Sequence, residues 1–87
     1  MMNLDSVTDI LNNKGFRRSV SPRPTEEGLD IIDFTHRKRM DMFSAYVDVY
    51  GSVKFVEHTK IKWDSEARRN VPSVTKYYGL KEFIRAV

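Results

Sequence analysis

The chain contains no cysteine, only four glycines and three prolines, and no long hydrophobic run. Without cysteine it can form neither a disulfide nor a thiolate metal site, so packing alone must hold the fold together, as in intracellular proteins. The first residues include acidic side chains where a signal peptide needs a basic start and an apolar stretch, and no segment approaches the length of a membrane span. We therefore expect a soluble cytoplasmic protein without membrane contact.

The sequence also lacks the common catalytic motifs. It has no phosphate-cradling glycine loop, no dinucleotide fingerprint and no Ser-His-Asp order in its required context. The spacing of His36 and His58 does not match that of metal ligands, so we expect no metal site. Because the catalytic and cofactor motifs are also missing, we expect no cofactor and infer no small-molecule substrate. The sequence therefore predicts a protein that is not an enzyme. One cluster fits a small metal-dependent nuclease, although its spacing departs from the Glu-x-Lys pattern. Its members are Asp30, Asp33, Glu57, His58 and Lys60.

Composition is ordinary for a globular protein. Of 87 residues, 40% are hydrophobic and 31% are charged, a balance that supports a packed core. A chain of this length forms one domain, residues 1–87, because it cannot divide its core in two. The net charge is +3, and the basic excess lies in residues 14–39 and 58–87. This charge favours polyanionic partners only weakly, since layout matters more than the sum.

The first 21 residues predict a helix followed by a strand. Ser6 and Asp9 resemble a capping box, apolar residues then recur at helical spacing, and Gly15 suits the left-handed residue that ends a helix, which predicts a helix over about residues 6–14. Alternation over residues 16–21 predicts a short strand, which Pro22 closes. Residues 21–28 contain two prolines and a glycine and predict a mobile loop.

Residues 28–50 predict a central strand, a basic turn and a further strand. Residues 28–36 are rich in β-branched and aromatic side chains, with apolar groups on both faces, which is typical of a strand inside a sheet. Residues 36–39 are too polar to be buried and should form a hairpin tip. Residues 40–50 alternate, which places Phe43, Ala45, Val47 and Val49 on the core face.

The next hairpin can be assigned a register, because directly opposite residues share a face. A three-residue loop over residues 51–53 avoids placing apolar residues opposite charged ones. It also puts Glu57 on the apolar side of the strand. Because an isolated buried carboxylate is costly, Glu57 would have to lie at the rim of the core or pair with an arginine. The pairs that this register predicts are Val49 with Phe55, Ala45 with Thr59, Phe43 with Ile61, Tyr50 with Lys54, Tyr46 with His58, and Ser44 with Lys60.

The last quarter of the chain predicts helices. Asp64 or Ser65 can cap a short helix through residue 70 that Pro72 ends, and Ser73 can cap a further turn. Apolar residues recur at helical spacing over residues 79–87. The expected fold class is therefore α+β, with a mostly antiparallel sheet of three to four strands and an N-terminal helix and C-terminal helices packed on one face.

Two surfaces have the composition of a binding site. The exposed sheet face implied by the register combines cations that can neutralise phosphates with aromatic rings that can stack on bases, although exposed strands commonly carry such residues for solubility. A second basic patch joins the 36–39 turn to the preceding strand, where solubility explains the charge equally well. The first surface comprises Tyr46, Tyr50, Lys54, His58, Lys60 and Lys62; the second comprises Arg37, Lys38, Arg39, Arg17 and Arg18, with Arg23 beside them.

These features together predict a small non-enzymatic binding domain. Its leading partner is nucleic acid, or a protein that acts on nucleic acid, engaged through the basic and aromatic sheet face and the basic hairpin tip. The alternative is a protein interaction module that uses a strand edge or forms a homodimer, such as an inhibitor or accessory protein of the kind that phages and mobile elements encode. The small metal-dependent nuclease is a second alternative.

Overall fold

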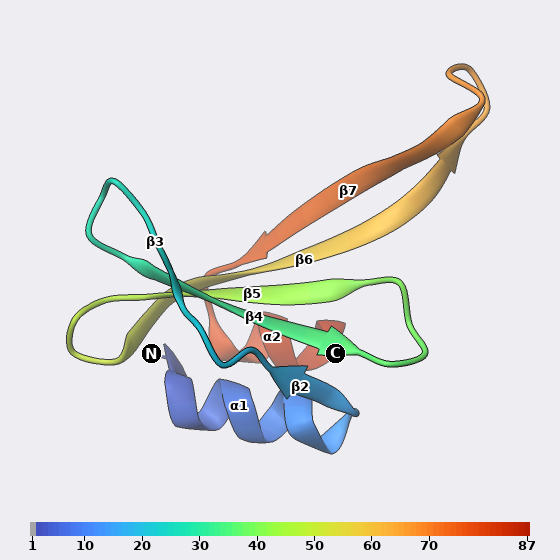
Figure 1. Cartoon of the computed structure of the whole chain (residues 1–87). Coiled ribbons are helices and arrows are strands. Elements are labelled where there is room, and N and C mark those ends of the chain that lie inside the picture. The colour runs from blue at the N-terminus through green and yellow to red at the C-terminus, as the bar shows by residue number, and fades with distance from the viewer. Residues whose placement is uncertain (1) are drawn as a thin grey trace.

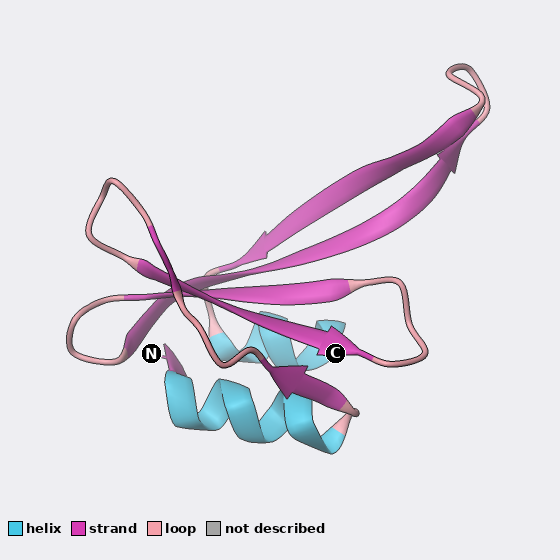
Figure 2. Ribbon diagram, in the orientation of Figure 1, coloured by secondary structure: helices cyan, strands magenta, loops and turns pink. Residues whose placement is uncertain are grey.

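Residues 2–87, which the computed structural model describes, form a curled antiparallel sheet with two helices on one face (Figures 1 and 2). We call the side that carries the helices the inner face and the opposite side the outer face. The α+β class and the packing of both helices on one face are as predicted. The elements are β1 (Met2–Asn3), α1 (Leu4–Asn13), β2 (Phe16–Arg18), β3 (Arg23–Pro24), β4 (Asp30–His36), β5 (Met42–Val47), β6 (Ser52–Asp64), β7 (Arg69–Tyr77) and α2 (Leu80–Ala86).

The sheet is larger than the three to four strands expected, with seven strands among residues 2–87. Strands β4, β5 and β6 form its centre, which confirms the interior position predicted for β4. Short β2 and β3 share the free side of β4, and β1 and β7 share the free side of β6. β3 lies inside the loop predicted for residues 21–28, where the Thr25 hydroxyl also bonds to the backbone of Leu29.

Helix α1 begins two residues earlier than predicted. The Asn3 side-chain oxygen accepts the backbone N–H of Ser6 at 2.8 Å and so caps the helix, which corrects the capping box assigned to Ser6 and Asp9. At the other end Gly15 adopts a φ of 88°, a left-handed conformation that glycine adopts without strain, so the predicted stop is confirmed. This residue turns the chain from α1 directly into β2.

The hydrophobic core lies between the inner face and the two helices. Phe43 is at its centre, with ring centroids of Phe16 and Phe83 at 5.0 and 5.9 Å in edge-to-face contact. The core positions predicted for Phe43, Ala45 and Val47 are confirmed, and α2 covers the core through fully buried Phe83.

The register predicted for the β5–β6 hairpin is wrong. β5 ends at Val47, and the turn is built by Asp48, whose carboxylate accepts the backbone N–H groups of Tyr50 and Ser52. Gly51 closes this turn with a φ of 82°, and Val49, expected in the core, is 83% exposed. The observed pairs are Phe43 with His58, Ser44 with Glu57, Ala45 with Val56, Tyr46 with Phe55 and Val47 with Val53, with a bulge at Lys54.

This register exchanges the two faces of β6. Val56 and His58 point inward and are buried, whereas Phe55, Glu57 and Thr59 lie on the outer face. Glu57 therefore does not lie on the apolar side of the sheet. Glu57 falls on the apolar side only in the register with a hairpin loop over residues 51–53.

The segment predicted as short helices is strand β7. Asp64 does cap a turn, accepting the N–H groups of Glu66 and Ala67, but the chain then reverses into a strand through Arg68 at a φ of 54°. Pro72 is tolerated because the far side of β7 has no neighbour among residues 2–87. Within the described range only one helix, α2, follows the sheet.

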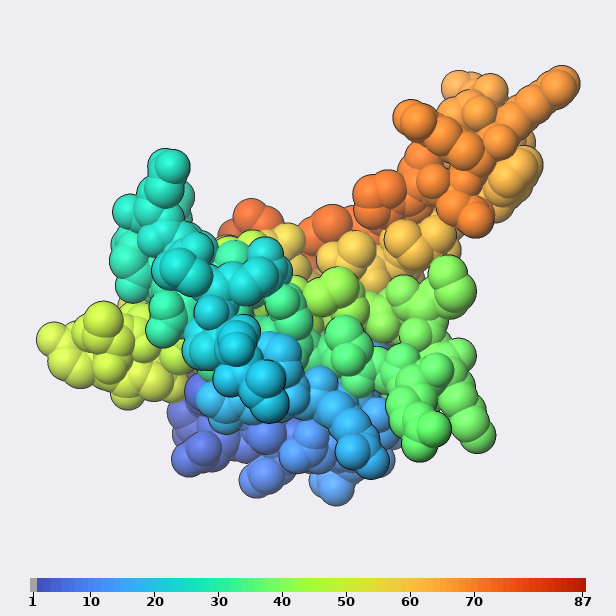
Figure 3. Space-filling model, in the orientation of Figure 1, coloured from blue at the N-terminus to red at the C-terminus, as the bar shows by residue number. Residues whose placement is uncertain are grey.

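The outer part of the β6–β7 hairpin projects from the rest of the molecule. β5 begins at Met42, opposite Thr59, so residues 60–64 pair only with residues 69–73. We call residues 60–73 the arm. Figures 1 and 3 show it extending from the same end of the molecule as the loop between β4 and β5. No helix of residues 2–87 is long and apolar enough to cross a membrane.

Candidate functional site

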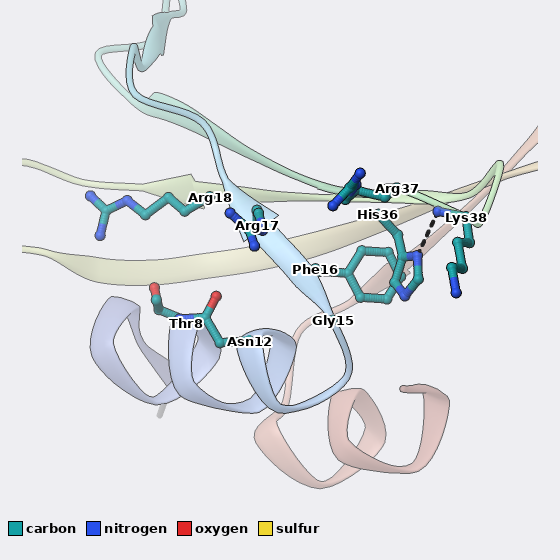
Figure 4. A pocket seen from close by; sticks show the side chains of 9 residues that line it. All are labelled: Thr8, Asn12, Gly15, Phe16, Arg17, Arg18, His36, Arg37 and Lys38. Carbon is teal, nitrogen blue, oxygen red and sulfur yellow. Dashed lines mark hydrogen bonds between the residues drawn. The ribbon is translucent and has the colours of Figure 1, made fainter.

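A pocket of about 730 Å³ lies between α1, β2 and the loop that follows β4. We call it the basic pocket, because four cationic side chains border it (Figure 4). Its volume is within the range of sites that hold small ligands or parts of larger ones. It is lined by Thr8, Asn12, Gly15, Phe16, Arg17, Arg18, His36, Arg37 and Lys38.

Sheet pairing brings the two basic segments together. Phe16 lies opposite His36 and Arg17 opposite Thr35, so β2 runs beside the end of β4. Residues 37 and 38 follow β4 directly and therefore lie next to the first residues of β2. The second patch predicted from the sequence is thus assembled, although its two segments are separated by 18 residues of chain.

We call residues 37–41, between β4 and β5, the basic loop, and His36 fixes its start. Its Nδ1 accepts the backbone N–H of Lys38 at 3.0 Å, and its ring packs edge-on against Phe16 with centroids 5.2 Å apart. In the neutral ring the proton is then on Nε2, which faces Gly15. A methyl group at Gly15 would lie 2.7 Å from this nitrogen, so only glycine fits here without displacing the imidazole.

The helix side of the pocket contributes neutral polar groups. Thr8 and Asn12 are one helical turn apart, and Figure 4 shows both side chains pointing from α1 toward β2. The Thr8 hydroxyl oxygen is buried and has no hydrogen-bond partner within residues 2–87. Both side chains can donate to an acceptor held by the cations.

The charge of the pocket is uncompensated. Arg17, Arg18, Arg37 and Lys38 are exposed, and none of them takes part in the ion pairs found in residues 2–87. In Figure 4 Arg17 and Arg37 lie above the pocket, Lys38 lies beside it, and Arg18 extends away along β2. Arginine and lysine side chains are suited to hydrogen-bond an anion with several oxygens.

Arg39, the last cation of the predicted patch, has a structural contact instead. Its Nε donates to Asp41 at 2.8 Å, and its guanidinium carbon lies 4.9 Å from the centroid of the Phe16 ring. Asp41 also bonds to Nε2 of buried His58 at 2.7 Å. Burial raises the pKa of the Asp41 carboxyl, but the hydrogen bonds from His58 and Arg39 outweigh it and hold the pKa below its usual value. These contacts anchor the basic loop to the core.

The other predicted surface, which combined tyrosines with lysines, is not assembled on one face. Tyr46 is half-buried on the outer face and stacks on Phe55 at 4.3 Å, whereas His58 is buried on the inner face. Tyr50 and Lys54 lie at the β5–β6 turn, where Lys54 pairs with Asp48 at 3.5 Å. This turn is at the opposite end of the sheet from the basic loop (Figure 1).

The remaining members of that surface, Lys60 and Lys62, are on the arm. They lie on the side that continues the inner face, beyond the region that the helices cover. Lys60 follows the last pair between β5 and β6, Met42 with Thr59, and is therefore adjacent to the basic loop in the sheet.

The carboxylates of the nuclease alternative are held by other partners. Asp33 accepts two hydrogen bonds from Arg23, at 2.8 and 2.9 Å, and one from Ser44 at 2.7 Å. The bonds from Arg23, ahead of that from Ser44, hold the pKa of Asp33 below its usual value. No group of three metal-ligating side chains occurs within residues 2–87, and His58 faces away from Glu57.

Glu57 acts on a tyrosine. Its hydrogen bond with the Tyr46 hydroxyl, together with burial and its negative charge, raises the pKa of Tyr46 to about 12. Tyr46, which its ordinary pKa already keeps neutral at physiological pH, therefore stays protonated to a still higher pH on the outer face.

The outer face carries an apolar stripe that the sequence reasoning did not identify. It includes the Tyr46–Phe55 stack and Tyr78, whose ring centroid is 5.4 Å from that of Phe55, and it continues on the arm beyond the polar pair Glu57 and Lys76. Trp63, near the tip of the arm, is 65% exposed. Apolar and polar residues alternate in the sequence of residues 59–63. This pattern predicts an apolar stripe only if residues 70–74 form a strand beside them, as they do in β7. The exposed apolar members are Ile61, Trp63, Val74 and Tyr78.

Comparison with known proteins adds no further constraint, because no family model, curated protein or solved structure matches the chain. The chemistry of the site therefore rests on its own residues.

Proposed function

We propose that this protein is a non-enzymatic binding domain that engages the phosphate backbone of nucleic acid through the basic pocket. The observation that carries the proposal is that Arg17, Arg37 and Lys38 surround one pocket with Arg18 at its border, and that none of these four cations is ion-paired within residues 2–87. Phosphate backbones are bound mainly through such cations.

The pocket wall supports phosphate as the ligand. Arginine presents planar pairs of N–H donors that match phosphate oxygens, and three of the four cations are arginines. The Thr8 hydroxyl and the Asn12 amide add neutral donors on the helix side. The basic loop is held by the His36 ring and by the bond between Asp41 and buried His58, which reduces the entropy lost when a ligand orders its side chains.

Fluorescence anisotropy with labelled oligonucleotides tests this function. In 50 mM salt we expect binding to both DNA and RNA strands, and Arg17→Gln or Arg37→Gln should each weaken it by roughly three- to ten-fold. Lys54→Gln removes the same charge at the opposite end of the sheet and is the matched control, with an expected change below about two-fold. Equal losses in all three variants would show that only the net charge matters, and the proposed site would be wrong.

A second candidate function, self-association, is favoured by the apolar stripe on the outer face. Two copies could bury Ile61, Trp63 and Val74 against each other, which would remove exposed apolar surface from water. Pairing through the free edge of β7 is less favoured, because Pro72 in its middle has no N–H to offer. Light scattering after gel filtration distinguishes a dimer from a monomer, and Trp63→Ser should abolish the dimer if the stripe forms it.

A further inference from the structure

The arm has two chemically different faces. Opposite residues of a strand pair share a face, so Lys60, Lys62 and Asp64 lie on one side of β6 with Ser73, Val71 and Arg69 opposite them on β7. The other side carries Ile61 and Trp63. The first side is the basic face of the arm, and Arg68 in the turn adds a further cation at the tip.

The basic face is free of competing contacts. Lys60, Lys62, Arg68 and Arg69 are exposed and take part in none of the ion pairs in the part of the chain that the structure describes. Asp64 is the one carboxylate in this row, and its oxygen accepts backbone N–H groups of the turn. The four cations of the arm outnumber its two carboxylates, Asp64 and Glu66, so a net positive charge faces solvent.

The shape of the arm selects among polyanions. A two-stranded ribbon five residues long on each side extends about 17 Å. The major groove of B-form DNA is about 12 Å wide and admits such a ribbon. The major groove of an RNA duplex is deep and narrow and does not. A single strand has no groove, so it would gain only phosphate contacts.

From these features we infer that the arm enters the major groove of double-helical DNA with its basic face, while the basic pocket holds an adjacent stretch of backbone. The inference rests on the proposed function and names its substrate class. Figure 3 shows an open hollow between the arm and the basic loop, which project from the same end of the molecule. Ser73 and Val71, between the cations, can contact base edges and thymine methyl groups.

One set of titrations tests the inference. A DNA duplex, its single strand and the corresponding RNA duplex are titrated at 100 mM salt with the wild type and with two variants of equal charge, Lys60→Gln/Lys62→Gln on the arm and Arg17→Gln/Arg37→Gln at the pocket. We expect the wild type to bind the DNA duplex at least five-fold more tightly than either other ligand. The arm variant should lose roughly ten-fold toward the DNA duplex and less than about three-fold toward the single strand. The pocket variant should weaken binding to all three.

The possible failures are distinguishable. If the arm variant binds the DNA duplex like the wild type, or loses affinity equally for all ligands, the groove contact is refuted, while the pocket variant still reports on the proposed function. If the wild type binds none of the ligands, both proposals fail. Lys60→Arg/Lys62→Arg, which keeps the charge, should retain the preference for duplex DNA, and unchanged circular dichroism shows that each variant is folded.

Discussion

At the scale of single residues, Gly15 connects the fold to the basic pocket. Its left-handed conformation ends α1, and the absence of a side chain lets the His36 imidazole pack against the backbone. Gly28 has a similar φ of 82° but open space around its Cα. A side chain at Gly28 would meet only backbone strain, whereas a side chain at Gly15 would meet backbone strain and a steric clash with His36.

Alanine at these positions gives a matched comparison. Gly28→Ala should cost only the left-handed strain, about 1 kcal/mol of unfolding free energy. Gly15→Ala should cost more, about 2–3 kcal/mol, because the methyl group also displaces His36. Urea denaturation followed by circular dichroism measures both, and equal midpoints would contradict the role assigned to the His36 contact.

The Asp33 carboxylate makes a second residue-scale prediction, about pH. Its folded pKa is held below the usual value by Arg23, so its contribution to stability is present above about pH 4 and disappears as the pH falls through the lowered pKa. Asp33→Asn should cost about 1 kcal/mol at pH 7, a modest value because Arg23 is largely exposed.

The stability difference between wild type and Asp33→Asn should therefore shrink below pH 4. Denaturant titrations at pH 7, 5 and 3 measure it. Asp30→Asn, which removes an exposed carboxylate on the same strand that makes no ion pair within residues 2–87, is the control for the loss of charge alone. A difference that stays constant from pH 7 to pH 3 would mean that the Arg23 contact does not stabilise the fold.

At the scale of elements, the arm differs from the rest of the sheet. Beyond Thr59, β6 has only β7 as a neighbour and no helix beneath it, and an isolated two-stranded ribbon is marginally stable in water. Strands β4 and β5, by contrast, contribute the fully buried Phe34 and Phe43. Local stability should follow this difference.

Hydrogen exchange tests this contrast in the free protein. Amides of residues 60–64, 69–71 and 73 should exchange at least a hundred-fold faster than those of residues 31–34 and 43–47, because their opening exposes no core. Binding of duplex DNA should slow the arm amides if the arm enters a groove. Protection of the arm equal to that of the core, without ligand, would indicate that it is already packed against a partner such as a second copy.

The elements also show what the sequence could predict. Helical periodicity and its stop at Gly15 identified α1, and the apolar pattern identified β4, α2 and the inward residues of β5. The β5–β6 register was missed because apolar Val49 was counted as core. Gly51 stands first in the predicted three-residue loop, where the preferred left-handed position comes later, and in the structure it takes that conformation in a turn built by the Asp48 carboxylate.

β7 was missed for a related reason. Pro72 was interpreted as a helix terminator, but an edge strand also accepts proline, and the neighbouring valines, threonine and tyrosines favour a strand. The sequence predicted only the cationic part of the pocket, because the basic side chains of residues 17, 18, 37 and 38 suggested one basic patch. Thr8 and Asn12 could not be identified, because only the long-range pairing of β2 with β4 brings α1 to that loop.

At the scale of the whole molecule, unpaired positive charge is concentrated at the end of the sheet that carries the basic loop. The basic pocket, the basic loop and the base of the arm lie together, whereas the β5–β6 turn at the opposite end balances Lys54 with Asp48. A net charge of +3 is too small to attract polyanions by itself, so its placement must provide the specificity.

The most direct test of phosphate binding at the basic pocket is the salt dependence of affinity for a single-stranded oligonucleotide. The logarithm of the association constant should fall linearly with the logarithm of salt concentration, and Arg17→Gln/Arg37→Gln should reduce the slope by about 1.4, corresponding to two lost phosphate contacts. A slope that is the same in wild type and variant, or no binding by the wild type at 20 mM salt, would contradict the account.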